Sequence, residues 1–212
     1  ACEKCSDTGY LENGELCPCA RLKLAGRKYS SSGISENAGF DRFNENIFKD
    51  PEQLKRTRRA AEICAQYAEN LEIGGAKGLL LMGETGLGKT FLMDSIGREA
   101  IRRGCSVKKY TAYNLIDAAL RAVRRHEAGP ELTGAELLLL DDLGTEPMIP
   151  GVTIETLFAA INERQFAGKA TVIATNLTKN ELFTQYGERI FSRLFASREY
   201  AAITLRGKDL RM

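Results

Sequence analysis

The sequence predicts an α/β fold in which a parallel β-sheet is flanked by helices, and three observations lead to that prediction. Short apolar runs of strand length alternate along the chain with segments whose apolar residues recur at helical spacing. A glycine-rich turn separates the first of these runs from the helix after it. The 212 residues suffice for one domain, or for one domain with a small appendage.

The composition and charge of the chain exclude several classes of protein. Hydrophobic residues make up 43% and charged residues 27%, and the formal net charge is +2, which excludes a disordered tail, a collagen-like fibre and a strongly basic histone-like DNA binder. No apolar run approaches the roughly 20 residues of a membrane-spanning helix, and polar residues 1–5 exclude a secretory signal. The chain starts at Ala1 rather than Met, as expected of a fragment that lacks its true N-terminus.

The elements follow in a regular order. Pro51 suits the first turn of a helix that continues to about Asn70, and Gly74-Gly75 ends it. Strands are expected at Lys77–Met82, Ser106–Thr111, Leu137–Leu140, Ala170–Ala174 and Tyr200–Leu205. Helices between them are expected at Phe91–Arg102, Ala112–Arg125 and Val152–Phe166. The run Leu137–Leu140 has no polar position, which predicts a strand buried on both faces.

Three parts are expected along the chain. Residues 1–20 hold four of the six cysteines, residues 21–42 contain Ser30-Ser31-Ser32-Gly33 and favour a linker, and residues 43–212 contain the alternating elements. Four apolar residues are expected to anchor the linker onto the third part: Phe40, Phe43, Ile47 and Phe48.

The turn after the first strand carries the most specific motif. It reads Gly83-Glu84-Thr85-Gly86-Leu87-Gly88-Lys89-Thr90 and fits G-x-x-x-x-G-K-[ST] at every fixed position. The glycines let backbone N–H groups point at phosphate oxygens, Lys89 can reach the β- and γ-phosphates, and Thr90 can ligate Mg²⁺. A chance glycine-rich turn is disfavoured by the strand before it and the helix after it. We therefore expect Gly83 through Phe91 to contact a nucleotide.

Two carboxylates end the strand Leu137–Leu140. Asp141 can bind Mg²⁺ directly or through water, and Asp142 can orient or deprotonate an attacking water. A solvated turn is the alternative, which the phosphate loop makes less favourable. Asn176 closes the next strand, where its amide could hold the water or the γ-phosphate; a helix cap or turn is its other interpretation. Thr178 can cap the following helix instead.

This constellation resembles a known family. The order of Gly83–Thr90, Leu137–Asp142, Thr175-Asn176 and Tyr186–Leu194 resembles the AAA+ ATPases, and more narrowly the bacterial replicative helicase loaders of the DnaC/DnaI type. The runs Asp141–Gly144 and Gly207–Arg211 also match that group. The resemblance covers about Phe43 to Met212 and implies a phosphate-loop AAA+ core.

The resemblance also implies roles for single residues. Asn176 corresponds to sensor 1, Arg211 to sensor 2, and Arg193 to the arginine finger that enters a neighbouring subunit's ATP site. Such a finger supplied in trans can raise the rate by ~10³–10⁵ and implies a homo-oligomer with shared ATP sites. Arg189 is the rival for the finger, and a surface salt bridge is the other interpretation of Arg193.

The chain departs from the family in two places. Most AAA+ enzymes have Glu where this chain has Asp142, and the shorter side chain predicts slow hydrolysis. We expect oligomerisation or DNA to stimulate the hydrolysis. Only 36 residues follow Asn176, so the usual helical lid is expected to be reduced or absent. The setting of Arg211 depends on how the chain runs in place of that lid.

A basic segment lies in the middle of the chain. Between residues 98 and 125 there are eight basic and two acidic side chains, with Tyr110 and Tyr113 interleaved. Basic groups that track phosphates and aromatic rings that stack on bases are the ingredients of a single-strand binding surface. Solvated helix faces are the alternative. The candidate DNA-binding residues are Lys108, Lys109, Tyr113, Arg121, Arg124 and Arg125.

The cysteines of residues 1–20 form two pairs, Cys2-x-x-Cys5 and Cys17-x-Cys19, with eleven residues between them. A tight turn can bring such thiolates to one tetrahedral Zn²⁺, so we expect a zinc knuckle. Disulfides are the alternative, but a phosphate-loop ATPase is normally cytosolic, where thiols stay reduced. Cys64 and Cys105 are expected to be buried apolar residues. His126, the single histidine, is expected at a helix end, which disfavours a Ser-His-Asp triad.

Together these features predict an ATP-binding and hydrolysing protein that loads a replicative DNA helicase onto single-stranded DNA. The expected cofactors are ATP, Mg²⁺ and Zn²⁺; the expected partners are the helicase, single-stranded DNA and further copies of this chain, in the cytoplasm and without a membrane. One alternative is a transposition-helper ATPase of the insertion-sequence type, which shares the core and binds duplex DNA. Another is a nucleotide-switched adaptor with negligible turnover. A small-molecule kinase would need an acceptor pocket and lid for which the chain has no length.

Overall fold

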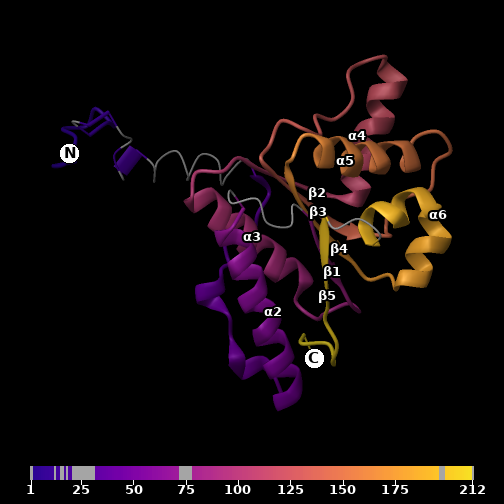
Figure 1. Cartoon of the computed structure of the whole chain (residues 1–212), viewed down its shortest axis with the longest axis horizontal. Helices are drawn as coiled ribbons and strands as arrows, with labels where there is room; N and C mark the ends of the chain where they lie inside the picture. Colours follow the sequence, from indigo (N-terminus) through magenta and orange to yellow (C-terminus); the bar gives the residue numbers. More distant parts are fainter. Residues whose placement is uncertain are drawn as a thin grey trace.

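The described part of the protein is built around one parallel sheet. The computed structural model describes residues 2–11, 13–14, 17, 19–20, 32–71, 78–195 and 199–211. Its five strands lie in the order β2-β3-β4-β1-β5 and helices cover both faces, so the predicted α/β class is confirmed (Figure 1). Residues 21–31 of the predicted linker, the expected helix end at Gly74-Gly75 and the first residue of the first expected strand, Lys77, lie outside the described residues.

The strands pair in parallel throughout the described sheet. They are β1 (Gly78–Met82), β2 (Val107–Thr111), β3 (Leu137–Leu143), β4 (Ala170–Thr175) and β5 (Tyr200–Thr204). The helices are α2 (Pro51–Glu69), α3 (Lys89–Arg102), α4 (Ala112–Arg125), α5 (Thr153–Phe166) and α6 (Lys179–Phe195), with short 3₁₀ turns η1 (Phe40–Arg42) and η2 (Glu45–Ile47). No helix among them is long and apolar enough to cross a membrane.

Two apolar layers hold the helices onto the sheet. Alternate strand residues point to opposite faces, so Leu79 and Leu139 pack with α2 and α3, whereas Leu80 and Ile173 pack with α4, α5 and α6. Figure 1 shows these two groups of helices on either side of the sheet. Leu137 to Leu140 are at most 1% exposed, which confirms a strand buried on both faces.

Side chains near the helix starts satisfy free backbone N–H groups. The Asp50 carboxylate accepts from Glu52 N in front of α2, and the Thr111 hydroxyl accepts from Asn114 N at the start of α4. Thr178 and Glu181 form a reciprocal capping box at α6, so the predicted capping role of Thr178 is confirmed. His126 adopts a left-handed conformation at the end of α4, as expected of a helix-end residue.

Residues 32–42 of the predicted linker pack along α3. Ile34 and Ala38 are buried, and Ile34 belongs to the apolar layer of α2 and α3. Gly97 on α3 makes room for it, because a Cβ at Gly97 would lie 2.6 Å from Ile34 Cδ1. Arg98 Nη1 also donates to Ala38 O at 2.6 Å. These residues are therefore fastened along α3 rather than forming a loose connection.

Strand β3 runs three residues further than expected. Its pairing with β4 shifts register between Leu140 and Leu143, and Asp142 in this bulge has a left-handed φ of 54°. The Thr175 hydroxyl donates to Leu143 O at 2.6 Å and holds the bulge against β4. No helix follows β5 in the described residues 205–211.

Arg164 on α5 is a fully buried cation that joins the starts of two strands, β3 and β4. Its guanidinium donates to the Thr171 hydroxyl and to four backbone carbonyl oxygens, and burial lowers its pKa to about 10. The carbonyl acceptors belong to Leu132, Ala135, Glu136 and Ala170. One side chain therefore satisfies the backbone where the chain enters β3 and β4.

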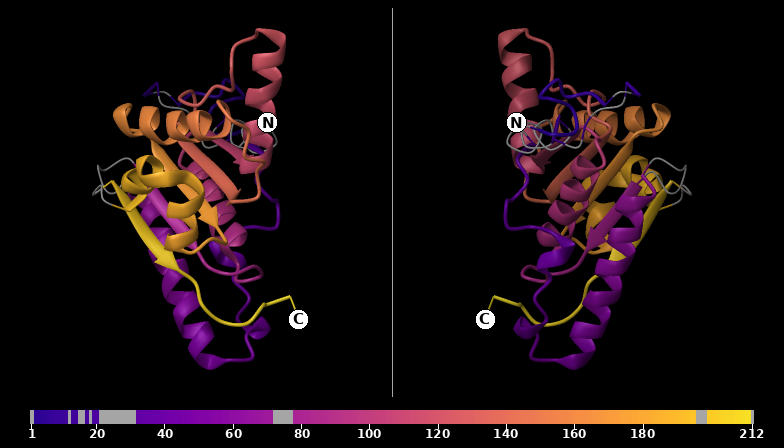
Figure 2. Two further views of the ribbon diagram at one scale, coloured as in Figure 1. Left: turned by 90° about the vertical axis from the view of Figure 1, so that its right-hand side faces the viewer. Right: turned by 90° about the vertical axis from the view of Figure 1, so that its left-hand side faces the viewer.

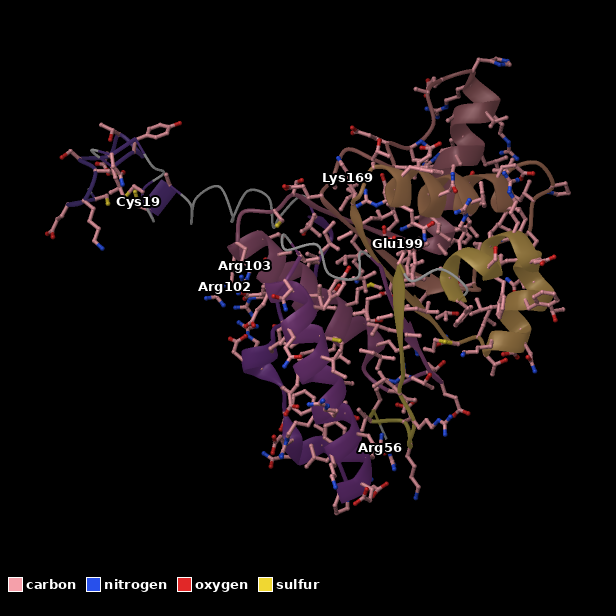
Figure 3. The ribbon with its side chains drawn as sticks, viewed as in Figure 1. Cys19, Arg56, Arg102, Arg103, Lys169 and Glu199 are labelled. Atoms are coloured by element: carbon pink, nitrogen blue, oxygen red, sulfur yellow. The ribbon has the colours of Figure 1, made fainter. Side chains whose placement is uncertain are left out.

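We expect Arg164→Ala to lower the free energy of unfolding by about 2–4 kcal/mol, because the deletion leaves several buried carbonyl oxygens without donors. Urea denaturation followed by circular dichroism measures the change. Arg102→Ala is the matched control, because the Arg102 side chain is 71% exposed at the end of α3 (Figure 3). Equal stability losses in the two variants would contradict the structural role of Arg164.

Candidate functional site

The glycine-rich turn wraps around a lysine. The turn links β1 to α3, and Gly83, Gly86 and Gly88 all have positive φ, a conformation that side chains with a Cβ rarely adopt. Lys89 is 6% exposed, and its Nζ donates to Gly83 O and Glu84 O at 2.7 Å each. Burial lowers the pKa of Lys89, and the carboxylates of Asp142 and Asp141 oppose that shift. The loop thus holds a cation at the N-terminal end of α3.

The acidic end of β3 lies against the first turn of α3. Thr90 Oγ1 donates to Asp141 Oδ1 at 3.3 Å, and Asp142 N donates to the same oxygen at 3.0 Å. A hydroxyl and a carboxylate are the hard oxygen ligands that Mg²⁺ prefers, so the donor set fits that ion. The structure therefore brings together the two residues expected to hold Mg²⁺.

Asp142 faces a cavity beside the phosphate loop. Burial raises the pKa of Asp142, and the neighbouring charge of Asp141 adds to the effect. The cavity measures about 580 Å³, a size typical of small-molecule sites. Its lining includes residues of the loop and of α3, together with Phe43, Phe48, Thr57, Asp142, Asn176, Leu210 and Arg211.

Four of the predicted site residues thus come together from distant parts of the chain. Lys89, Asp142, Asn176 and Arg211 all line the cavity. The Arg211 guanidinium pairs with Asp209 through Nε at 3.0 Å and Nη2 at 2.7 Å, and these bonds lower the pKa of Asp209 to about 2. A cavity lined by residues that carry an ammonium, a guanidinium, a carboxylate and an amide can bind phosphate groups and position water.

The two arginines considered for the finger lie on α6. Neither lines the cavity of its own chain. The Arg189 guanidinium lies over the Phe158 ring at 3.6 Å, and that of Arg193 is 5.9 Å from the same ring and 6.0 Å from Phe166. This position is compatible with a role in a neighbouring subunit, which stays a prediction.

Five of the six candidate DNA-binding residues are exposed, and the sixth is a lysine that points inward. Lys108, Tyr113, Arg121, Arg124 and Arg125 are exposed on β2 and α4. Arg121 pairs with Asp117 at 2.9 Å, an exposed i,i+4 pair of small energetic weight. The five side chains form the candidate DNA-binding surface that the structure retains.

Lys109 corrects the predicted DNA-binding set. Its Nζ lies 2.6 Å from Asp94 Oδ1 and 3.3 Å from Asp141 Oδ2, and the side chain is 12% exposed. An ammonium held between two buried carboxylates does not present its charge to a nucleic acid. Lys109 instead belongs to the acidic end of β3.

Asp94 and Gln53 are residues of the site region that sequence reasoning missed. Asp94 is 2% exposed in the middle of α3, and Ser35 N also donates to its carboxylate. An acidic residue on an otherwise apolar helix face is a signal that could have identified it. Gln53 on α2 is 3% exposed and has no comparable signal in the sequence.

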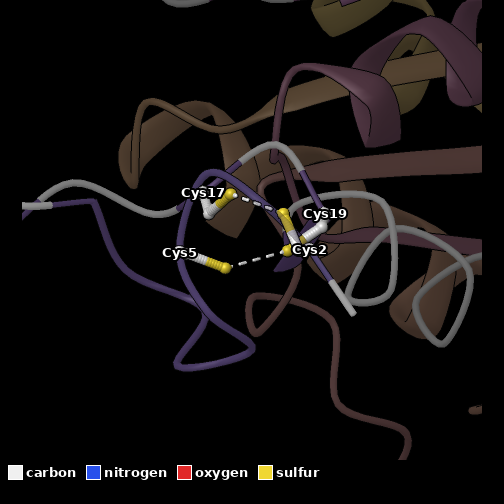
Figure 4. A group of neighbouring side chains, drawn as sticks. All are labelled: Cys2, Cys5, Cys17 and Cys19. Carbon is white, nitrogen blue, oxygen red and sulfur yellow. Dashed lines mark hydrogen bonds between the residues drawn. The ribbon is translucent and has the colours of Figure 1, made fainter.

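The four N-terminal cysteines converge on one point. All four Sγ atoms lie within 4.8 Å of one another, and no disulfide joins them (Figure 4). Cys2 and Cys17 are 3.7 Å apart, and Cys5 and Cys19 are 3.4 Å apart, measured between sulfurs. Tetrahedral Zn–S bonds of about 2.3 Å place sulfurs about 3.8 Å apart, so the cluster fits zinc.

The thiols of this cluster also differ in acidity. Donation from the backbone of Lys4, helped by the neighbouring thiols, lowers the pKa of Cys2 to about 7. The hydrogen bond to Cys5 raises the pKa of Cys19 to about 12, because the thiol is held in its protonated, donating form. Cys64 and Cys105 lie outside this cluster and are buried, as predicted.

Comparisons with known proteins identify the family of this chain. A family model described as IstB-like ATP binding protein matches residues 70–195, more than half of the chain. Chromosomal replication initiator protein DnaA of Zymomonas mobilis is 33% identical over 186 residues, which cover 84% of this chain and 36% of DnaA. Replicative helicase loader DnaC of Escherichia coli is 25% identical over 178 residues, covering 79% of this chain and 68% of DnaC.

A mobile-element protein and a solved structure are also similar. The ATP-binding protein of insertion sequence IS5376 from Geobacillus stearothermophilus is 31% identical over 122 residues, covering 56% of this chain and 46% of that protein. A crystal structure of the DnaC helicase loader aligns with a TM-score of 0.67 at 21% identity, over 81% of this chain and 98% of that chain, and shows the shared fold. This chain thus spans well under two thirds of the DnaA and insertion-sequence proteins. With the family match, the phosphate loop and the acidic strand end in place, the chain belongs to the IstB-like ATP-binding family of AAA+ ATPases, which is related to the DnaC loaders.

Proposed function

We propose that this protein hydrolyses ATP and uses the nucleotide cycle to load a replicative DNA helicase onto single-stranded DNA. The observation that carries the ATPase part is the convergence of Lys89, Asp142, Asn176 and Arg211 on one cavity, with Thr90 and Asp141 beside it. The similarity to DnaC, of which the chain covers 68%, supports the loader part. We propose that it acts in the cytoplasm, where thiols stay reduced.

The proposed reaction is an attack of water on the γ-phosphorus of ATP. The bond between the γ-phosphorus and the bridging oxygen breaks, ADP leaves with that electron pair, and Asp142 takes the proton of the water. Asn176 orients the water through its amide, and Lys89 and Arg211 stabilise the negative charge of the transferring group. Thr90 and Asp141 would hold Mg²⁺, which would supply positive charge to oppose the charge of the phosphate groups.

The role of Lys89 gives the first test of this proposal. We expect Lys89→Ala to weaken ATP binding roughly 10- to 100-fold, because a charged hydrogen-bond donor to phosphate contributes about 1.5–3 kcal/mol. Equilibrium titration with a fluorescent ATP analogue measures the affinity. Lys55→Ala is the control, since Lys55 is exposed on α2. Asp142→Asn is expected to reduce hydrolysis while binding persists; unchanged ATP affinity in Lys89→Ala would overturn the nucleotide site.

We propose that a neighbouring copy of the chain contributes to the site. Arg193 and Arg189 are held on α6 by the rings of Phe158 and Phe166, outside their own cavity. An oligomer that brings α6 of one copy to the cavity of the next would complete the site with a guanidinium. Arg193 is the proposed finger.

For DNA we propose the exposed face of β2 and α4. Lys108 and Arg121 supply phosphate contacts and Tyr113, which is 54% exposed, supplies a ring for base stacking. Arg124 and Arg125 extend the charge along the last turn of α4. A surface that combines charge and an exposed ring suits single strands, whose bases are free to stack.

The second candidate is a transposition helper that acts on duplex DNA. The family match and the similarity to the IS5376 protein favour it. The two candidates differ in the nucleic acid and in the protein partner. They are therefore separated by one set of binding measurements.

For a loader, we expect ATP-dependent co-purification with the host's replicative helicase and tighter binding to single-stranded than to duplex DNA. Neutralising Arg121, Arg124 and Arg125 to Gln is expected to reduce the slope of log K against log salt by about 2, since ~0.7 counterions are released per neutralised phosphate on single strands. Fluorescence anisotropy measures the slope, with Lys55→Gln as control. A preference for duplex DNA without helicase capture would favour the transposition helper instead.

We also propose that the N-terminal cluster holds one structural zinc ion. Cys2, Cys5, Cys17 and Cys19 supply four sulfurs at the spacing that a tetrahedral ion requires. Thiolate ligands would form as zinc displaces the thiol protons. The ion would order a segment that has little apolar core of its own.

We expect the purified chain to carry about one zinc per molecule, as for a closed four-cysteine site. Elemental analysis and mercurial release followed by a zinc indicator measure the content. Cys17→Ala is expected to lose the metal, whereas Cys105→Ala, which alters a cysteine outside the cluster, retains it. Zinc bound equally by both variants would contradict the assignment.

A further inference from the structure

A buried glutamine joins the start of α2 to the segment that follows β5. Gln53 is 3% exposed, its Nε2 donates to Lys208 O at 2.8 Å, and its Oε1 accepts from Lys208 N at 3.0 Å. Both polar ends of the amide are therefore used on the backbone of one residue, 155 positions away in the chain. A paired contact of this kind fixes the direction as well as the position of the segment.

Gly207 allows the approach. Its φ is 148°, and a Cβ at this position would lie 2.1 Å from the amide carbon of Gln53 and 2.5 Å from its nitrogen. A side chain here would push Gln53 away from the backbone. The chain thus carries a glycine where the amide needs space.

The same segment, residues 205–211, crosses the phosphate loop. Leu205 N donates to Met82 O at 2.8 Å, and Leu210 N donates to Gly86 O at 3.0 Å. A Cβ on Gly86 would lie 2.0 Å from the Asp209 carboxylate, so the segment touches the loop closely. Figure 2 shows the segment turning from the end of β5 toward the first turns of α2.

Both ends of this contact reach the cavity. Leu210 and Arg211 line it on the side of the segment, and Thr57 lines it on the side of α2. Thr57 is one turn after Gln53, and its hydroxyl donates to Gln53 O at 2.9 Å. Gln53 therefore ties together two walls between which a nucleotide would bind.

We propose that Gln53 is a positioning residue of the nucleotide site: it clamps residues 205–211 across the phosphate loop and so keeps Arg211 at the cavity. The segment then forms one wall of the site. The inference rests on the proposed ATPase function for its kinetic consequence. The docking of the segment is independent of that function.

Hydrogen exchange tests the docking on the full chain without nucleotide. We expect Gln53→Leu to speed exchange of the amides of Lys208 and Leu210 at least tenfold, while amides of β1 and β3 keep their protection. Gln66→Leu is the matched control, since Gln66 is an exposed glutamine on the same helix. Gln53→Glu keeps the acceptor for Lys208 N and loses the donor, so an intermediate rate is expected; it also serves if Gln53→Leu does not fold. Unchanged exchange in both Gln53 variants would overturn the clamp.

Kinetics test the link to Arg211. We expect Gln53→Leu and Arg211→Ala each to lower kcat about tenfold, the loss expected when one charge-assisted contact is removed. The double variant is expected to be no slower than Arg211→Ala, because Gln53 acts through that residue. Additive losses would overturn the positioning role. If the unaltered chain binds no ATP, the proposed function fails, while the exchange experiment still decides the clamp.

Discussion

The parallel register of β1, β3 and β4 is the constraint on which the site depends. These strands are buried on both faces over most of their length, so polar groups gather where the strands end. Thr175 of β4 pairs with Met82 on one side and with Leu143 on the other. The phosphate loop, the acidic residues and Asn176 therefore leave the sheet at one edge. No long-range bond among them is needed to bring them together.

Periodicity was enough to predict most of the fold, because local pattern and tertiary packing agree there. The helix Ala112–Arg125 has the predicted bounds. An apolar stripe runs along it, Thr111 caps its start, and His126 ends it in a left-handed conformation, and all three signals are local in the sequence. The end of β3 was not predictable in this way. Its bulge and the left-handed Asp142 depend on the pairing with β4, which no local pattern records.

The residues of the candidate site likewise fall into those that a local motif predicts and those that depend on contacts distant in the chain. The phosphate loop is a contiguous motif, so its residues could be assigned from the sequence. The partners of Lys109 and Gln53 lie far from them in the chain, and a basic or amide side chain alone does not say whether it points inward. Lys109 was therefore predicted at a DNA surface, although buried Asp94 and Asp141 hold its ammonium. Only the three-dimensional arrangement separates a binding charge from a structural one.

The group of Lys109, Asp94 and Asp141 has a thermodynamic consequence. One ammonium balances two buried carboxylates, so the ionised group retains one surplus negative charge away from water. A cation bound to the folded chain at Asp141 would offset this negative charge, and the unfolded chain offers no equivalent site. Such binding would be linked to folding by mass action. A free cation concentration 100-fold above the dissociation constant would add about 2.7 kcal/mol to the free energy of unfolding. The free energy of unfolding of the whole core would then report whether a cation occupies the site.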